Sequence, residues 1–173
     1  RLPVTKLINE FDLEIKYGED KITSTYIKSS NVYRPSLSLI GFFDLIEEVS
    51  NIGIQIFSKI EFKFLENLPP IERVNNLKKF LNYDIPMIVL TVDANPPEYF
   101  FDLVKKSGHI LAIAPYKKAS QIVANFNNYL DSFFSIKFNH IISYQSVSSM
   151  YKFKSSFTFS YSTFTSKQYS KTK

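Results

Sequence analysis

Arg34 is the side chain of this sequence whose setting best suits polar chemistry. It follows the polar residues 29–31, and Pro35 holds its backbone extended, so it lies in a loop. A guanidinium presents a rigid fork of N–H donors, so Arg34 can bind an anion or contact a partner. It can also hold its own loop in place by pairing with Asp44 or Glu47. Both interpretations stay open, and the loop-holding one is favoured.

The other titratable side chains do not form an evident catalytic or metal site. His109 and His140 are far apart, and His109 opens an apolar stretch, which favours a structural role. Asp44, Glu47 and Glu48 could act as an acid/base cluster, but their spacing is more typical of a solvated helix face. The chain has no cysteine, which excludes disulfides and thiolate chemistry. We therefore expect no catalytic, cofactor-binding or metal-binding residue.

A phosphate-binding loop requires closely spaced glycines, because backbone N–H groups must approach the phosphates. The four glycines of this chain are Gly18, Gly41, Gly53 and Gly108. None opens a Gly-x-x-x-x-Gly-Lys pattern, and no two are close enough for a dinucleotide fingerprint. The sequence thus predicts no nucleotide site of either kind.

The chain alternates strand and helix patterns up to about residue 136. Strands are expected at 13–17, 22–27, 52–56, 85–92 and 110–114. Helices are expected at 5–11, 43–49, 60–65, 70–81, 97–107 and 120–134. Asp93 and Glu98 flank a Pro-containing turn, where acids would cap the helix that follows. The spacing suits βαβ units and predicts a single α/β domain over residues 1–136, with a mostly parallel or mixed sheet flanked by helices.

The basic charge of the chain belongs to its last 37 residues. The formal net charge is −1 over residues 1–136 and +6 over residues 137–173. This second segment is a low-complexity basic tail, rich in Ser, Phe, Tyr, Lys and Thr, and is predicted to be irregular. Its aromatic and lysine residues could contact single-stranded nucleic acid, but this interpretation is disfavoured, because they follow no regular register.

The tail also differs in the codons that its residues imply. Gly, Ala, Val, Asp and Glu fill 33 of the first 136 positions, and only Val147 represents them afterwards. All five are encoded by codons that begin with G. Our hypothesis is that residues 137–173 are translated out of frame, and the alternative is a genuine low-complexity tail.

Membrane insertion and secretion have no support in the sequence. The longest apolar run, 85–92, is too short to span a bilayer. No secretory signal pattern is present, although residue 1 is Arg and the start is therefore open. A cytoplasmic location is expected.

Five segments, in order, resemble the N-terminal domain of bacterial HPr kinase/phosphorylase. They are 30–44, with Arg34-Pro35 and Gly41-Phe42-Phe43-Asp44; 54–65, with Ile54-Gln55 and Lys59; 84–91, with Ile85-Pro86; Pro96-Pro97-Glu98; and Asn128-Tyr129-Leu130. Ser36 and Ser58 replace glycines of the family pattern. The family's His-Gly segment is not matched, because His140 is followed by Ile141.

The resemblance implies an origin in a larger enzyme. The family phosphorylates a serine of the phosphocarrier HPr with ATP or pyrophosphate and Mg²⁺, reverses that reaction, and assembles as a hexamer in carbon catabolite control. This chain then corresponds to the non-catalytic regulatory or assembly domain, truncated before the P-loop domain that contacts HPr. The alternative is a stand-alone domain that binds a small ligand or partner at its sheet ends.

Overall fold

The computed structural model describes residues 1–39, 41 and 52–135. The chain divides into two units, residues 1–132 and 133–173. The architecture below is that of the first unit. Three expected features, the helix at 43–49, the acidic residues within it and the basic tail from 137 onward, lie outside the described residues.

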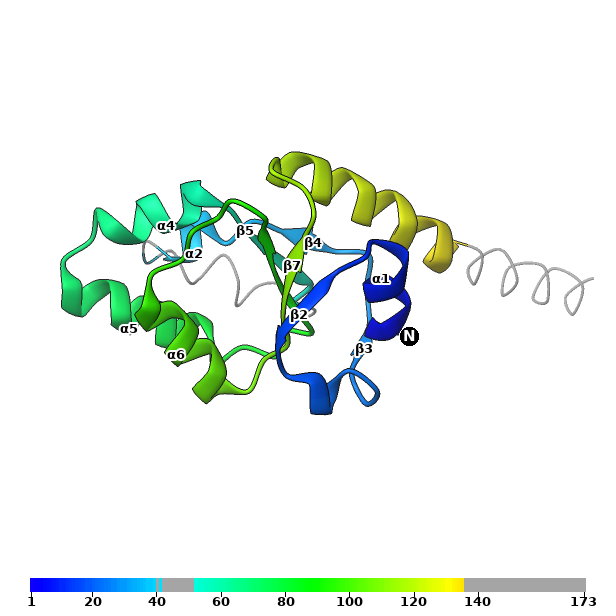
Figure 1. The fold of residues 1–173 in the computed structure, drawn as a ribbon, viewed down its shortest axis with the longest axis horizontal. Helices are drawn as coiled ribbons and strands as arrows, with labels where there is room; N and C mark the ends of the chain where they lie inside the picture. Colours follow the sequence, from blue (N-terminus) through cyan, green and yellow to red (C-terminus); the bar gives the residue numbers. More distant parts are fainter. Residues whose placement is uncertain (40, 42–51, 136–173) are drawn as a thin grey trace, which may run out of the picture. The chain divides into compact units, whose positions relative to one another are not determined.

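A five-stranded mixed sheet forms the centre of the first unit (Figure 1). Its spatial order is β2 (Glu14–Tyr17), β7 (Leu111–Ala114), β6 (Ile88–Thr91), β5 (Ile54–Phe57) and β4 (Val32–Tyr33). The last four are parallel, and β2 pairs with β7 in the antiparallel sense. The expected α/β fold with a mixed, largely parallel sheet is confirmed.

Helices cover the sheet on both sides, as a parallel sheet requires. Figure 1 shows α2 (Ser36–Leu39), α4 (Lys59–Glu66), α5 (Pro70–Phe80) and α6 (Glu98–Ser107) on one side. The other side carries α1 (Val4–Glu10) and a helix that begins at residue 119. Phe57, Phe80 and Phe100 are fully buried on the first side and pack ring against ring.

Three helix boundaries follow directly from residue chemistry. Ser58 caps α4, and Glu61 completes a capping box with it. Pro70 occupies the first turn of α5, where its missing N–H is not needed. Gly108 ends α6 in the left-handed conformation, with φ of +71°. The predicted starts and stops at Pro70 and Gly108 are confirmed.

Two expectations require correction. The segment 22–27 is a strand only at β3 (Tyr26–Ile27), which pairs with β1 (Leu2–Pro3) in a separate two-stranded sheet. The Lys21 carbonyl accepts hydrogen bonds from two following N–H groups at 3.1 and 3.0 Å, which folds the chain into a turn instead. The strand expected at 52–56 begins later, at Ile54 of β5, where Gln55 is buried together with its apolar neighbours and its amide donates to the Gly53 carbonyl at 3.0 Å.

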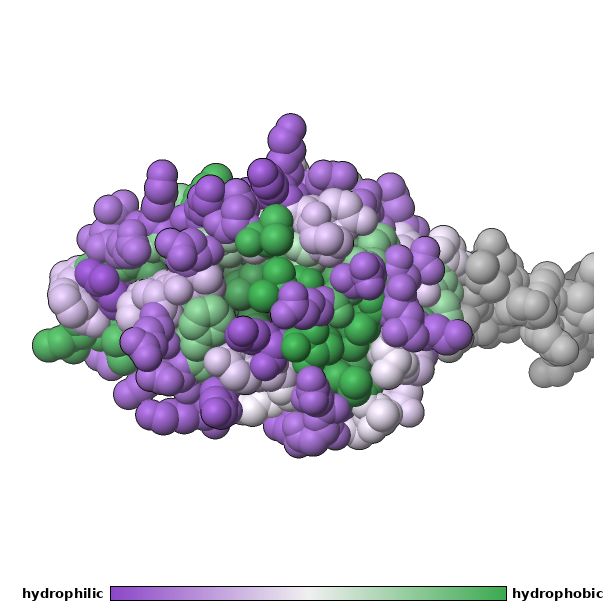
Figure 2. Space-filling view, in the orientation of Figure 1, coloured by the Kyte–Doolittle hydropathy of each residue, from purple (hydrophilic) through white to green (hydrophobic). Residues whose placement is uncertain are grey.

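The sheet is partly bare at its β2 edge. Figure 2 shows hydrophobic surface gathered around the position of β2 and β7, between hydrophilic residues of the flanking elements. Tyr17, Phe101 and Ile113 are the half-buried hydrophobic residues that pack against the core in this region. Along β2 the exposed charged residues Glu14 and Lys16 alternate with Ile15 and Tyr17, and such charges protect an edge strand from pairing with other chains.

Candidate functional site

Arg34 lies directly after β4, at the carboxyl edge of the sheet, and contacts a buried acid. Its Nη2 is 2.8 Å and its Nε 2.9 Å from Oε1 of Glu61. The other oxygen of Glu61 accepts hydrogen bonds from the Ser58 hydroxyl at 2.6 Å and the Ser58 N–H at 2.8 Å. Both carboxylate oxygens are thus occupied. Glu61 was not among the partners that the sequence suggested for Arg34. The suggested partners, Asp44 and Glu47, lie outside the described residues.

The exposure of the pair indicates what it does. The Glu61 side chain has no solvent exposure, whereas that of Arg34 is 34% exposed. A buried carboxylate is costly unless a cation and hydrogen-bond donors compensate it. Arg34 and Ser58 supply both, so the arrangement joins β4 to the start of α4. A further contact of the exposed part of Arg34 with an anion or partner stays a prediction.

A second ion pair lies at the same edge of the sheet. Lys59 Nζ is 2.9 Å from Oδ2 of Asp93, which follows β6. The hydrogen bond from Lys59 holds the pKa of Asp93 below its ordinary value. Asp93 therefore ties two strand ends together, and the helix cap expected of it is wrong: α6 starts after Pro97 without a side-chain cap.

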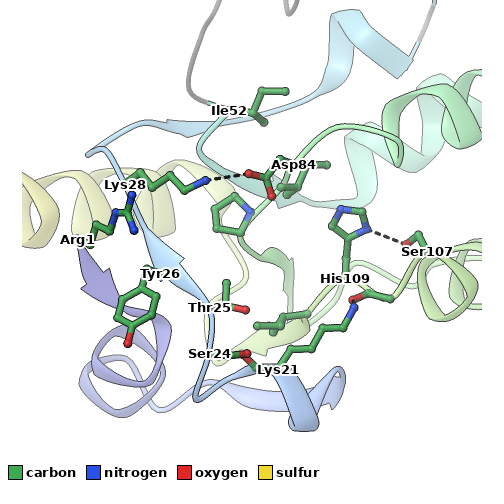
Figure 3. A pocket seen from close by; sticks show the side chains of 14 residues that line it. Arg1, Lys21, Ser24, Thr25, Tyr26, Lys28, Ile52, Asp84, Ser107 and His109 are labelled. Carbon is green, nitrogen blue, oxygen red and sulfur yellow. Dashed lines mark hydrogen bonds and ion pairs between the residues drawn. The ribbon is translucent and has the colours of Figure 1, made fainter.

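A cavity lies at the opposite edge of the sheet, where β6 and β7 begin (Figure 3). It has a volume of about 550 Å³, within the range of small-molecule sites. Turns, strand starts and a helix end converge on it. We call it the amino-edge pocket; its lining residues are Arg1, Lys21, Ser24, Thr25, Tyr26, Lys28, Ile52, Asp84, Ile85, Pro86, Ser107, Gly108, His109 and Ile110.

Two lysines reach into the amino-edge pocket from separate turns (Figure 3). Lys21 Nζ donates to the Gly108 carbonyl at 2.6 Å. Lys28 Nζ lies 2.9 Å from Oδ2 of Asp84. Asp84 is the only acid among the described residues that line this pocket, so the balance of charge there is positive.

His109 forms part of the pocket wall. Its Nε2 is 3.1 Å from the Tyr83 carbonyl, and its Nδ1 is 2.8 Å from the Ser107 hydroxyl. A carbonyl can only accept, so Nε2 carries a hydrogen. Burial lowers the pKa of the ring, and Lys21 acts in the same direction. These contacts agree with the structural role favoured from the sequence.

The described residues do not assemble a phosphoryl-transfer site. They contain no group of three or more acids and histidines that could hold a metal ion. The four glycines of the chain lie far apart in the sequence and do not form a loop that could cradle phosphates. ATP or pyrophosphate with Mg²⁺ therefore does not fit the residues present, and we derive no catalytic step from them. What the described surface offers is the amino-edge pocket.

None of the helices in the described part of the chain combines the length and apolar composition needed to cross a bilayer. The described residues form an α/β domain with a basic pocket at the amino edge of its mixed sheet. The family described as the HPr Serine kinase N terminus matches residues 2–130. The chain belongs to this family, as its sequence segments suggested.

Relatives of known name agree with the family. The chain is 95% identical over 135 residues to a protein of Fusobacterium nucleatum subsp. nucleatum named "Putative HPr kinase/phosphorylase", covering 78% of this chain and 22% of that protein. It is 30% identical over 131 residues to the HPr kinase/phosphorylase of Thermoanaerobacter sp. strain X514, covering 76% of this chain and 41% of the relative. The chain thus spans well under half the length of these relatives.

A solved structure gives a weaker likeness. It is the CBS and DRTGG domains of the regulatory region of Clostridium perfringens pyrophosphatase, complexed with diadenosine tetraphosphate. The TM-score is 0.41 at 13% identity, over 73% of this chain and 49% of that one. Values this low do not establish a shared fold.

Proposed function

We propose that this chain is the non-catalytic regulatory or assembly domain of an HPr serine kinase/phosphorylase of carbon catabolite control. The match of the family over residues 2–130 carries the proposal. The phosphates, metal and base of phosphoryl transfer are then handled by a part of the enzyme outside this domain, and that part also contacts HPr. The domain works in the cytoplasm of a bacterium and takes part in the homo-oligomer of its family.

The residues of the domain support this division of labour. Two of its acids serve the fold: the buried Glu61 is compensated by Arg34 and Ser58, and the partly exposed Asp93 pairs with Lys59. A catalytic acid or base must be free to exchange a proton with a substrate. The carboxylate oxygens of Glu61 are engaged within the protein and are not free in this way.

The amino-edge pocket favours a second candidate function, a stand-alone domain that binds a small ligand. The two functions differ in what the domain does for a catalytic partner. In the first, the domain acts on the assembly or activity of the enzyme that carries it. In the second, ligand binding has no connection with phosphoryl transfer.

Removing the domain from an intact relative distinguishes the two. The Fusobacterium protein would be prepared whole and without the 135 residues that match this chain. Light scattering would measure the oligomer, and mass spectrometry would follow HPr phosphorylation with ATP and Mg²⁺. We expect the shortened protein to keep phosphoryl transfer but to change its oligomer or its regulation. An unchanged oligomer together with unchanged rates would contradict an assembly or regulatory role.

A further inference from the structure

We propose that the amino-edge pocket binds a small ligand that joins a phosphate-type anionic group to an apolar or aromatic body. The proposal goes beyond the regulatory or assembly role, and it deepens the second candidate function by naming the class of ligand. It rests on the charge, the hydrogen-bond donors and the apolar wall that separate chain segments bring together there (Figure 3).

The two lysines keep donors for an anion. An ammonium group has three N–H donors. Lys21 uses one on the Gly108 carbonyl, and Lys28 uses one on Asp84. Two N–H groups on each lysine can therefore be directed to ligand oxygens. The Asp84 side chain is 89% exposed, so its pairing with Lys28 is screened by water and is readily exchanged for a ligand.

The carboxyl end of α6 by itself would repel an anionic ligand. The carboxyl end of a helix carries partial negative charge on its last carbonyls. Gly108 is the residue that ends α6, and the Lys21 ammonium contacts its carbonyl at 2.6 Å. This cation offsets the helix end and leaves the pocket with a net positive field. Anionic ligands are therefore favoured over cations and neutral molecules.

An apolar wall faces the lysines. Ile52 and Pro86 line the pocket as partly exposed residues, whereas Ile85 and Ile110 line it but are almost fully buried. Tyr26 stands at the rim with 43% of its surface exposed, so its ring is available for stacking. An inorganic anion has no apolar part that could contact this wall. The volume of about 550 Å³ also exceeds what a single phosphate fills.

Phenyl phosphate is the simplest probe that has both parts. The full chain, labelled with ¹⁵N, would be titrated with phenyl phosphate, inorganic phosphate and phenol while amide shifts are followed by NMR. We expect saturable shifts at Thr25, Gly108 and Ile110, with a dissociation constant of about 1 mM or below for phenyl phosphate. Inorganic phosphate and phenol should each bind more weakly, because each lacks one half of the recognised ligand.

Charge variants test the proposed contacts in both directions. The double variant Lys21→Gln/Lys28→Gln should weaken phenyl phosphate binding by about tenfold or more. Asp84→Asn should strengthen it about two- to fivefold, because it removes the acid that competes for Lys28. The matched control is Lys63→Gln/Lys118→Gln, which removes two exposed lysines outside the pocket and should change binding less than about twofold.

Three results would overturn the proposal. One is the absence of saturable shifts at about 20 mM phenyl phosphate. Another is equal weakening in the pocket variant and in the control, which would indicate general charge attraction. The third is unchanged binding in Asp84→Asn, a surface variant that is expected to fold normally. Since binding is measured on this chain alone, loss of the proposed enzyme role would not affect the outcome.

Discussion

The guanidinium of Arg34 and the carboxylate of Glu61 meet at 2.8 Å, although the two residues are 27 positions apart. Glu61 is fully buried, and its second oxygen is held by Ser58. One acid therefore fixes the loop after β4 and caps α4 at once. The fold depends on this pair at the carboxyl edge of the sheet.

Replacing Arg34 by Met should destabilise the domain by about 2 kcal/mol, because the buried Glu61 carboxylate loses its cation. Adding Glu61→Gln to this variant should recover part of the loss, since an amide at this position can still accept at the capping box. Urea unfolding followed by circular dichroism would measure both. A loss below about 0.5 kcal/mol for Arg34→Met, a typical surface effect, would contradict a structural role for the pair.

Gly53 is predicted to tolerate no side chain. A Cβ added there would lie 1.8 Å from the Asn31 carbonyl oxygen. The same oxygen accepts a hydrogen bond from the N–H of Ile54, the first residue of β5. Gly53→Ala should therefore cost about 3 kcal/mol, because the clash is with backbone and cannot be relieved by a rotamer change. Gly41→Ala is the comparison: among the described residues the atom nearest to an added Cβ is 3.9 Å away, so within that part of the chain only its positive φ opposes the change. Equal stability of the two variants in urea would refute this account.

The stability of the domain should fall as pH is lowered through the range where His109 titrates. Burial lowers the pKa of the folded ring below its ordinary value of 6.5. Between those two pKa values the unfolded chain binds more protons, so the free energy of unfolding rises with pH there. The contribution is intact above about pH 6.5 and is lost progressively below it.

The variant His109→Gln isolates this effect. Urea unfolding of the two proteins between pH 5 and 8 would be compared, which removes the shared contribution of the carboxylates. We expect the free energy of unfolding of the wild type, minus that of the variant, to decrease as pH falls. A difference that stays constant over this range would show that His109 does not titrate in a perturbed environment.

The tail hypothesis predicts a feature of the gene. If residues 137–173 are out of frame, the DNA beyond codon 136 should encode a Gly-x-x-x-x-Gly-Lys loop in another frame. Sequencing that region and translating all three frames would decide the matter. An intact frame with no such continuation would leave a genuine tail as the explanation.

The elements could be predicted because their signals are local. The apolar run at 85–92 contains β6, and Pro70 and Gly108 bound helices through effects that reach only a few residues. The strand expected at 22–27 failed because a turn after Lys21 competes with extension, and β-rich residues alone do not reveal it.

The pocket could not be predicted, because its contacts are distant in sequence. Lys21 meets Gly108 across 87 positions, and Lys28 meets Asp84 across 56. Each lysine by itself resembles ordinary surface charge. Arg34 was singled out for contact with an anion, a partner or an acid near its own loop, and its contact with Glu61 was not foreseen. Glu61 lies in α4, after β5, and the parallel pairing of β4 with β5 brings the two residues together.

The most direct test of the central claim is phosphoryl transfer to HPr. The full 173-residue chain would be incubated with HPr, ATP and Mg²⁺, and with pyrophosphate and Mg²⁺, with the intact Thermoanaerobacter relative as the positive control. Intact-mass spectrometry would report phosphorylated HPr. Our account predicts phosphorylation by the relative and none by this chain, since it lacks a phosphate-binding loop. Sustained turnover by the chain alone would contradict the account.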